Sequence, residues 1–434
     1  MNLRETLKVN NNGHLEIGGV DSLDLVKEFG TPLYVMDQSY IENMCSVYKN
    51  ALEKYYGDGM ICYASKAFSC KAIYRIINEQ GLGCDSVSGG ELYTALKAGF
   101  PMEKVCVHGN NKSLEELNFA INSKVGYIVI DSYNEADKID ELCKEKRVTQ
   151  NVLIRVNPGV EAHTHHFIQT AKVDSKFGFS ISSGEAKDII RHVIKKENIN
   201  LVGLHCHIGS QIFENKSFAI AVEKMTDFYK ELKNEYNIEF SVLNLGGGFG
   251  IYYAEGDIKK SCDDYADYIK IISETLLENV KRKKLKKPFL ILEPGRSIVG
   301  EAGITLYSVG SIKEIKGVKK YIAINGGMFE NPRYALYQAK YTLVKANDMN
   351  APLSEKYSIA GKCCESGDII AEDVALPQVE VGDILAVLST GAYNYSMSSN
   401  YNRNLIPPVI MVKEGKASYA VKPQTYEDLI RNDV

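Results

Sequence analysis

A lysine and an acid–arginine pair stand at the ends of two apolar runs that lie far apart in the chain. Lys66 closes the run that begins at Met60, and Glu293 and Arg296 follow the run Phe289–Leu292. An amine can form an imine with an aldehyde, a carboxylate can pair with a protonated ring nitrogen, and an arginine can bind a phosphate. Either feature alone is weak, because a lysine at a strand end is usually solvated and a Pro-Gly pair usually marks a turn. Together they predict a site that holds pyridoxal phosphate (PLP).

A group of glycines follows another apolar run. Gly246, Gly247 and Gly248 precede Phe249 and Gly250. Glycines let backbone N–H groups approach a phosphate closely, although the same residues could form a plain flexible turn. The spacing is not the G-x-G-x-x-G pattern with a downstream acid, so a dinucleotide site is disfavoured.

Two histidines in the apolar run Leu201–Ile208 offer flat rings, and a serine beyond its end offers a hydroxyl. His207 could lie against a cofactor ring and Ser210 could donate to a phosphate, although a lone histidine is more often structural. His205 and His207 project to one side of a strand, so a metal pair is conceivable. Since no Cys or His partner stands at ligand spacing, we predict no metal site.

One loop carries a cluster of histidines and an acid, namely His163, His165, His166 and Asp174. The cluster is compatible with a metal site and equally with plain surface, because the loop leads into Ser175-Lys176-Phe177-Gly178 before a helical pattern. We assign these residues no role.

Two polar loops of the C-terminal third could also contribute to a site. The loop Gly361–Asp368 contains Cys364 and Glu365, a pair that could supply a proton and a ligand carboxylate, or could belong to an ordinary turn. The loop Gly391–Asn402 holds three tyrosines among asparagines and serines, and it is too polar for a core. It is typical of a binding loop with hydroxyl donors.

The elements that must position these residues are strands alternating with helices. Eight short β-rich runs are predicted, at Gly59–Ser65, Gly81–Val87, Val105–His108, Gly126–Asp131, Asn151–Asn157, Leu201–Ile208, Ser241–Leu245 and Phe289–Leu292. Between them lie segments with apolar residues at helical spacing. This alternation predicts a parallel sheet, and eight units predict a (β/α)8 barrel.

Polar residues gather at the C-terminal ends of these runs, the face on which a barrel carries its site. In chain order they are Lys66, Asp85 with Ser86, His108, Asp131, Arg155, His205 with His207, the glycines 246–248, and Glu293 with Arg296. Because a random scatter of charges would not favour strand ends, the pattern indicates an enzyme.

After about residue 303 the pattern changes to alternating runs separated by turns, which predicts an antiparallel β-domain. The first 37 residues look similar, and we expect their short strand-like pieces to pair with this domain. The predicted boundaries are therefore a PLP-binding barrel at 38–302 and a β-domain formed by 1–37 and 303–434.

The whole-chain composition is that of an ordinary globular protein. Its 434 residues suffice for two domains, and a net charge of −4 gives no reason to expect a nucleic-acid partner. The basic run Lys281–Lys287 is interpreted as a solvated turn. No apolar stretch reaches the roughly 18 residues of a membrane span, and the N-terminus lacks the apolar core of a signal peptide. Ten cysteines without a regular framework fit a reducing cytoplasm.

Several strings together resemble a known family over almost the whole chain. They are YASKA, CDSVSGGEL, HCHIGSQ, GGGFG, EPGR, ALY, CCESGD and STGAYNYSMSSNYN. The chain resembles the diaminopimelate decarboxylases, in the fold-type III group of PLP enzymes that also holds ornithine and arginine decarboxylases and alanine racemase. The resemblance implies the alanine-racemase-like fold, PLP as cofactor, and decarboxylation of meso-diaminopimelate at its D-centre to L-lysine.

The resemblance also implies site roles. Lys66 would be the Schiff-base lysine, Glu293 would pair with the ring nitrogen, His207 would stack on the ring, and Cys364 would donate a proton at the site of the other subunit of a homodimer. The implied cofactor-binding residues are Lys66, Asp85, His207, Ser210, Gly246, Gly247, Gly248, Glu293, Pro294, Gly295, Arg296 and Tyr393. The implied substrate-binding residues are Arg296, Arg333, Tyr337, Glu365, Ser366 and Tyr393.

Some positions depart from the family pattern. Asn325 stands where an aspartate is usual, Ala171 follows Thr170 where a glycine is usual, and Pro332-Arg333 reverses an arginine–proline order. The alternatives are an ornithine, arginine or lysine decarboxylase of the same fold, a racemase, or a PLP-binding protein without turnover. A mono-carboxylate substrate would not need Glu365 with an arginine, and a racemase needs a tyrosine acid and a shorter chain.

Overall fold

The computed structural model describes residue 3 and residues 7–160 and 176–434. The chain forms two compact units. One contains Met44–Gly250 and Lys260–Ser297, and the other contains Met1–Asn43, Ile251–Lys259 and Ile298–Val434. The histidine cluster at 163–166 with Asp174, and the departure at Thr170–Ala171, lie outside the described residues.

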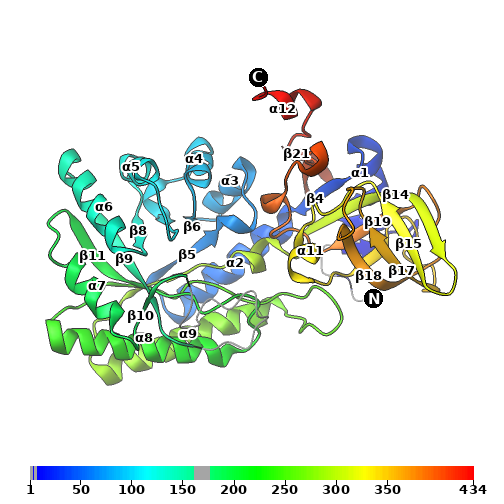
Figure 1. Ribbon diagram of the computed structural model, residues 1–434. Coiled ribbons are helices and arrows are strands. Elements are labelled where there is room, and N and C mark those ends of the chain that lie inside the picture. Colours follow the sequence, from blue (N-terminus) through cyan, green and yellow to red (C-terminus); the bar gives the residue numbers. More distant parts are fainter. Residues whose placement is uncertain (1–2, 4–6, 161–175) are drawn as a thin grey trace. The chain divides into compact units, whose positions relative to one another are not determined.

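The first unit is a closed parallel barrel, several of whose strands are labelled in Figure 1. Among the described residues its strands are β5 (Gly59–Ala64), β6 (Gly83–Ser86), β7 (Val105–Val107), β8 (Tyr127–Ile130), β9 (Gln150–Asn157), β11 (Ile199–His205), β12 (Val242–Asn244) and β13 (Phe289–Leu292). Each pairs in parallel with its neighbours, and β9 pairs with both β8 and β11, so the sheet closes. The predicted (β/α)8 barrel is thus confirmed. A short further strand, β10 (Phe179–Ser180), lies beside β9 and was not predicted.

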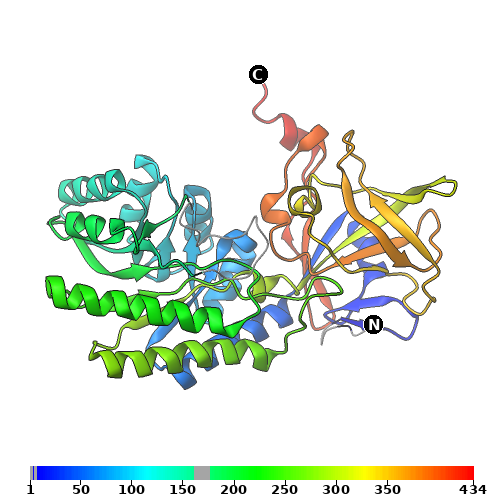
Figure 2. The same cartoon turned by 60° about the horizontal axis from the view of Figure 1, so that its bottom comes forward.

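Helices connect the strands. They are α2 (Gln38–Tyr55), α3 (Lys71–Glu79), α4 (Gly89–Lys97), α5 (Leu114–Asn122), α6 (Tyr133–Lys146), α7 (Glu185–Val193), α8 (Asn215–Tyr236) and α9 (Cys262–Lys283). Serines begin several of them: Ser113 and Ser261 each form a reciprocal capping box, with Glu116 and Asp264. The long helices α8 and α9 pack side by side, as Figure 2 shows.

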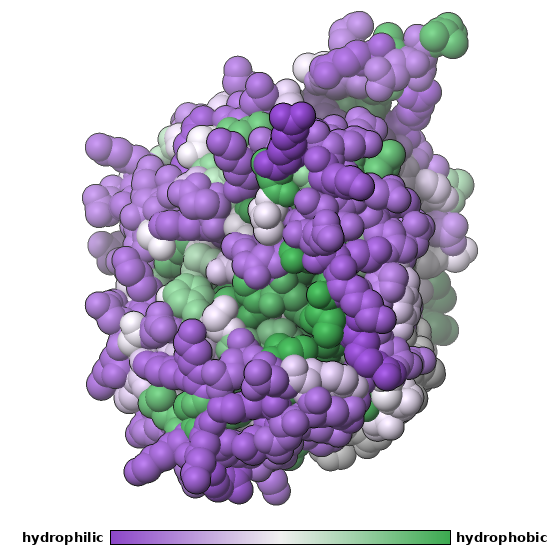
Figure 3. Space-filling view, turned by 90° about the vertical axis from the view of Figure 1, so that its left-hand side faces the viewer, coloured by the Kyte–Doolittle hydropathy of each residue, from purple (hydrophilic) through white to green (hydrophobic). Residues whose placement is uncertain are grey.

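Apolar side chains along the strands fill the barrel interior. Cys62, Cys106, Val129, Leu153, Val242 and Ile291 form a buried cluster, and Met60, Tyr127, Val202 and Phe289 pack against it while partly exposed. The face on the left of Figure 1 is polar at its rim and apolar in a hollow at its middle (Figure 3). The polar groups that could do chemistry lie instead where the strands end.

The second unit is rich in β-structure. Its large sheet contains β4 (Leu33–Asp37), β14 (Gly303–Ile315), β15 (Lys319–Ile324), β16 (Leu343–Lys345), β17 (Glu355–Ala360), β18 (Ile369–Leu376), β19 (Ile384–Leu388), β20 (Val409–Lys413) and β21 (Lys416–Val421). Most pairings are antiparallel, as predicted, but β15–β17 and β4–β20 are parallel. Both exceptions join strands that are not consecutive in the chain, so a crossover makes the parallel pairing possible.

The N-terminal segment is part of this unit. Strand β4 lies between β14 and β20. A small sheet of β1 (Leu7–Val9), β2 (Leu15–Ile17) and β3 (Val20–Asp21) precedes it, followed by α1 (Ser22–Phe29). Three short helices complete the two units: α10 (Arg296–Val299), α11 (Arg333–Tyr337) and α12 (Tyr426–Ile430). In the parts of the chain that the structure describes, no helix is long and apolar enough to cross a membrane.

Candidate active site

Lys66 and Glu293, far apart in the chain, follow neighbouring strands of the barrel. Strand β5, which leads to Lys66, pairs with β13, which leads to Glu293. The Ala64 amide donates to the Pro294 carbonyl at 3.0 Å, and a Cβ on Gly295 would lie 2.7 Å from the Cβ of Ala64. The two segments therefore touch through their backbones, and only glycine fits at the contact.

Lys66 is exposed in a short 3-10 turn, η1 (Ser65–Ala67), whose other two residues are buried. The Ser65 amide donates to Asp85 Oδ1 at 3.2 Å, and the Ser65 hydroxyl donates to Glu91 Oε2 at 3.0 Å. Burial, and then the negative charge of Glu293, raise the pKa of Asp85 to about 7, against the opposing charges of His108 and Lys66. The turn that presents the lysine is thus anchored by two acids from the next strand and its helix.

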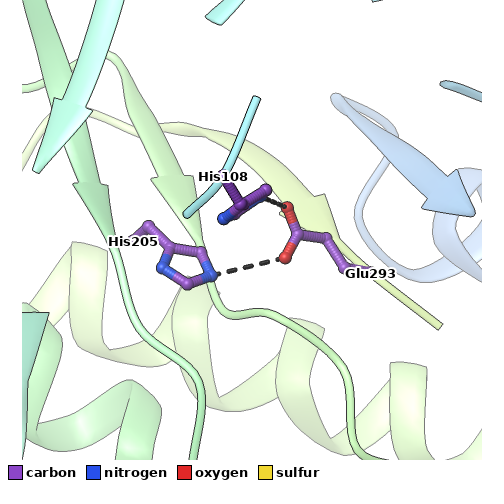
Figure 4. A group of neighbouring side chains, drawn as sticks. All are labelled: His108, His205 and Glu293. Atoms are coloured by element: carbon purple, nitrogen blue, oxygen red, sulfur yellow. Dashed lines mark hydrogen bonds and ion pairs between the residues drawn. The ribbon is translucent and has the colours of Figure 1, made fainter. Parts of the chain in front are cut away.

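Glu293 is a buried carboxylate surrounded by nitrogen donors. Its Oε1 accepts from His108 Nε2 at 2.8 Å and from Asn244 Nδ2 at 2.7 Å, and its Oε2 lies 3.3 Å from His205 Nε2. Figure 4 shows both imidazoles directed at the carboxylate. Burial opposes ionisation, but the imidazoles of His108 and His205 outweigh it and hold the pKa of Glu293 well below its usual range. The acid predicted to face a ring nitrogen is therefore held in its charged form.

The histidine pair differs from the one considered in the sequence. The sequence suggested that His205 and His207 could form a pair. In the structure the ring of His205 lies beside that of His108, with ring centroids 4.7 Å apart. The ligand atoms of His108, His205 and Glu293 lie within 4.8 Å of one another, which is compact enough for a cation. His108 Nε2 makes a hydrogen bond to Oε1 of the carboxylate, whereas His205 Nε2 lies 3.3 Å from Oε2 as a close polar contact. Burial lowers the pKa of His205 to about 3, so this ring is neutral at neutral pH.

His207 follows β11 and stands beside the glycine loop. Its Nδ1 accepts from the Gly247 amide at 3.4 Å. Burial, together with the positive charges of Lys66 and Arg155, lowers the pKa of His207 well below its usual range. A neutral imidazole with an accepting Nδ1 carries its proton on Nε2.

The glycine loop after β12 packs against two other strand ends. Gly246 has a positive φ of 65°, and a Cβ on Gly247 would lie 2.0 Å from the Glu293 carbonyl oxygen. The Gly248 carbonyl accepts from the Ile212 amide at 2.9 Å. This loop can only be made of glycine at these contacts, and it lies beside Glu293 and His207.

Ser210 and Arg296 meet at the same end of the barrel. Arg296 Nη2 donates to Ser210 Oγ at 2.9 Å, and the arginine is 9 % exposed. The loop after β11 and the segment after β13 therefore bring a guanidinium and a hydroxyl together, as the phosphate-binding prediction requires.

The remaining predicted residues belong to the β-rich unit. Cys364, Glu365 and Ser366 are exposed in the loop between β17 and β18. Asp368 holds this loop, because its carboxylate accepts from the Cys363 and Met328 amides, each at 2.6 Å. The Cys364 amide donates to Asn402 Oδ1 at 2.9 Å, which ties the loop to the tyrosine-rich segment. The three exposed side chains thus project from a backbone fixed at both ends.

Arg333 opens α11 and is buried among tyrosines. Its Nη1 donates to the Tyr341 hydroxyl at 2.7 Å, and its guanidinium lies 4.7 Å from the ring centroid of Tyr253. Tyr337, at the end of the same helix, is partly exposed, as is Tyr393, whose φ is 61°. The Pro332-Arg333 order is accommodated because Pro332 is the residue before the helix, where it needs no hydrogen-bond donor.

The departure at Asn325 has a structural explanation. Its Nδ2 donates to the Thr31 carbonyl and to the Thr31 hydroxyl, both at 2.8 Å, and its Oδ1 accepts from the Ser308 amide at 3.1 Å. An ionised aspartate could not donate to the Thr31 carbonyl. The amide at this position therefore joins β14 to the segment before β4.

Two residues on Glu293 were not predicted as site residues: His108 and Asn244. His108 was noted only as a polar residue at a strand end, and Asn244 was not noted at all. His108 follows a buried strand and Asn244 ends one, and this position at a strand end is the feature of the sequence that could have identified them.

The barrel residues fit PLP. They provide an exposed amine on Lys66, a charged acid with a lone pair left on Oε2 of Glu293, and a glycine loop beside a guanidinium and a hydroxyl. These are the groups that an aldehyde, a protonated ring nitrogen and a phosphate need.

Comparison with known proteins gives the same result. Residues 39–300 match the family described as pyridoxal-dependent decarboxylase, pyridoxal binding domain. The diaminopimelate decarboxylase of Bacillus subtilis is 49 % identical over 434 residues, covering 100 % of this chain and 98 % of that protein, and that of Staphylococcus aureus is 46 % identical, covering 99 % of each. The structure of the M. jannaschii diaminopimelate decarboxylase in complex with L-lysine has a TM-score of 0.91 and 38 % identity, covering 99 % of this chain and 98 % of that one. The chain therefore belongs to the pyridoxal-dependent decarboxylases and, within them, to the diaminopimelate decarboxylase family.

Proposed function

We propose that this chain decarboxylates meso-diaminopimelate at its D-centre and releases L-lysine and CO2. When bound, PLP supplies an electron sink for the electron pair that the departing carboxylate leaves behind. The observation that carries the proposal is the position of Lys66 and Glu293 at the ends of two paired strands, beside a glycine loop and a buried arginine.

The cofactor is held by the barrel residues. Lys66 would hold the aldehyde carbon through its amine, and Glu293 would keep the proton on the ring nitrogen by charge attraction. His207 would stack on the ring. The barrel residues that would bind the phosphate are Ser210, Gly246, Gly247, Gly248, Gly295 and Arg296, while Pro294 and Asp85 would shape the two strand ends. The family resemblance adds Tyr393 of the β-rich unit. The hydrogen bonds that fix Glu293 and the Lys66 turn support these assignments.

The substrate is recognised by its non-reacting amino-acid centre. The ammonium of that centre needs an acid, which Glu365 supplies, and its carboxylate needs an arginine, which Arg333 and Arg296 supply. Tyr337, Ser366 and Tyr393 complete the contacts. Cys364 then donates the proton that replaces the lost carboxyl group.

We further propose that the protein acts as a homodimer in the cytoplasm, with Cys364 serving the site of the partner subunit. The exposure of Cys364, Glu365 and Ser366 in a single chain supports a role outside their own unit. All ten cysteines are free of disulfides, which supports a reducing compartment.

The test is a substrate comparison. The purified chain is incubated with PLP and meso-diaminopimelate, with L-ornithine, L-arginine and L-lysine in parallel, and CO2 and the amine or amino-acid product are measured. Lysine and CO2 from diaminopimelate alone are expected. Turnover of a mono-carboxylate substrate instead would keep the fold and the cofactor roles but refute the assignment of Glu365 and Arg333.

A further inference from the structure

The buried amide of Asn244 lies between two parts of the site that belong to different strands. Asn244 ends β12 and is fully buried. Its backbone carbonyl accepts from the Cys206 amide at 2.9 Å, which ties it to the end of β11 as well. Its neighbours in register are His205 on β11 and Ile291 on β13, so the residue stands between the strands that lead to His207 and Glu293.

The orientation of this side-chain amide follows from one backbone contact. Asn244 Oδ1 lies 2.9 Å from the Gly246 amide nitrogen. An N–H can only donate, so the atom facing it must be the carbonyl oxygen. The other end of the amide is then the NH2 group, which donates to Glu293 Oε1 at 2.7 Å. One side chain thus joins the first glycine of the loop to the carboxylate.

The donors on Glu293 determine which of its lone pairs remains for a ligand. Oε1 accepts from His108 and Asn244, and Oε2 lies 3.3 Å from His205 Nε2. His108 comes from β7, three strands away from β13 around the barrel, whereas Asn244 and His205 come from the two preceding strands. Nitrogen groups from strands on both sides of β13 therefore contact the carboxylate, and Oε2 keeps the capacity to accept one more hydrogen bond.

We propose that Asn244 and His108 are positioning residues that fix the orientation of Glu293 and keep it charged for the cofactor ring, with Asn244 also tying that acid to the phosphate-binding glycine loop. This inference rests on the proposed function, because it assigns the ring nitrogen to Glu293. Neither residue touches the substrate in this scheme, and both act through Glu293.

Variants that remove a donor separate positioning from simple packing. Asn244→Asp keeps the size and the acceptor for the Gly246 amide, but it replaces the donor by a second carboxylate that repels Glu293. Such a pair holds a shared proton at low pH. PLP with a protonated ring nitrogen binds best to the charged form of Glu293. Binding of PLP to the variant must therefore displace the proton that the two carboxylates share.

Other titratable groups around Glu293 do not remove this effect, because each variant changes one residue and shares the rest with wild type. These groups are His108 after β7, His205 on β11, Asp85 on β6, Arg155 on β9, His207 after β11, Lys66, whose charge acts on Asp85, and the buried thiols of Cys62, Cys106 and Cys206.

The experiment measures the dissociation constant of PLP for the cofactor-free full-length chain from pH 5.5 to 8.5, by absorbance titration. The dissociation constant of each variant is divided by that of wild type at the same pH, so that the titration of PLP itself cancels. For Asn244→Asp this ratio is expected to have its lowest value at pH 8.5. It should rise by about tenfold for each pH unit below the raised pKa of the pair of carboxyl groups that the substitution creates with Glu293. His108→Leu is expected to show the same direction, and His108→Gln, which keeps a donor near the Nε2 position but not the imidazole's charge, is expected to show a smaller rise at low pH than His108→Leu.

A role in packing alone gives a different result. A ratio that does not change with pH for Asn244→Asp and His108→Leu would overturn the proposal, even if PLP bound more weakly. Circular dichroism of each cofactor-free variant controls for folding, and the His108 pair tests the proposal independently if Asn244→Asp does not fold. Failure of the wild-type chain to bind PLP or to decarboxylate diaminopimelate would instead refute the proposed function.

Discussion

Glu330 of the β-rich unit is a carboxyl group that the fold keeps protonated at neutral pH. The residue is fully buried. Its Oε1 accepts from the Tyr307 hydroxyl at 2.7 Å and from the Gly327 amide at 3.0 Å. Burial raises the pKa of Glu330 to about 8, and these hydrogen bonds offset only part of the effect. The folded protein therefore holds a proton that the unfolded chain releases at a much lower pH.

This difference makes the free energy of unfolding depend on pH. A glutamate in the unfolded chain has a pKa near 4.5, and the folded value is about 8. Because the folded state binds the proton more tightly, the stability contributed is fully present below pH 4.5 and is lost as the pH rises through about 8. Between pH 6 and pH 9 the loss amounts to about 2.5 kcal/mol.

Glu330→Gln is the matched variant, because an amide has the shape of the protonated acid and does not titrate. Its carbonyl oxygen can accept from Tyr307 and Gly327 as Glu330 Oε1 does. Because Glu330 Oε2 has no hydrogen-bond partner among the residues that the structure describes, the amide NH2 that replaces it adds a cost that does not depend on pH. The stability of the variant relative to wild type should therefore rise by about 2.5 kcal/mol from pH 6 to pH 9. Urea unfolding followed by circular dichroism, at a fixed PLP concentration, measures the difference at each pH, and the titrations of all other groups cancel.

Tyr307→Phe is the control, since it removes a hydrogen bond but leaves the carboxyl group in place. Its stability relative to Glu330→Gln should still fall towards pH 9. If the difference between wild type and Glu330→Gln stays constant from pH 6 to pH 9, Glu330 is not protonated in the fold and the reasoning from burial is refuted.

Three predictions concern the proposed active site. Lys66→Ala should abolish the absorbance of lysine-bound PLP and the mass increase after borohydride reduction, and an unchanged spectrum would place the attachment elsewhere. Cys364→Ala should lower turnover by about 10²-fold or more while PLP still binds, the effect of losing one acid catalyst. Near-normal turnover would remove Cys364 from the mechanism. Mixing these two variants should restore part of the activity if subunits share sites, and no recovery after demonstrated subunit exchange would count against sharing.

The barrel could be predicted because its strands are short apolar runs of regular spacing. The eighth run, Phe289–Leu292, has the same bounds as β13, and the run Gly126–Asp131 contains β8 with one extra residue at each end. Both differences at β8 fall at strand ends, where apolar content no longer determines the hydrogen bonding. Strand β10 has only two residues, too short for any alternation to be recognised.

The partners of the site residues were harder to predict. His108 and Glu293 are 185 positions apart, and their contact depends on the order of the strands around the closed barrel. The sequence shows that each ends a strand, but not which of the polar strand ends face one another. The parallel pairing of β4 with β20 could not be predicted for the same reason, since the alternation of apolar and polar residues along a strand does not specify which strand lies next to it.

Three buried carboxyl groups show what this spatial arrangement controls. Burial raises the pKa of Asp85 to about 7 and that of Glu330 to about 8, yet Glu293, equally buried, is held well below its usual range. Glu330 accepts from a hydroxyl and one amide, and Asp85 faces the negative charge of Glu293.

Glu293 differs because nitrogen groups from three other strand ends converge on it. Removing water favours the neutral form of any acid, so a buried acid stays charged only where the fold supplies donors in place of water. The proposed function needs one such charged acid, and the barrel provides one because parallel strands place their last residues at a common end. The identity of those last residues, rather than burial as such, determines which buried carboxyl group stays charged.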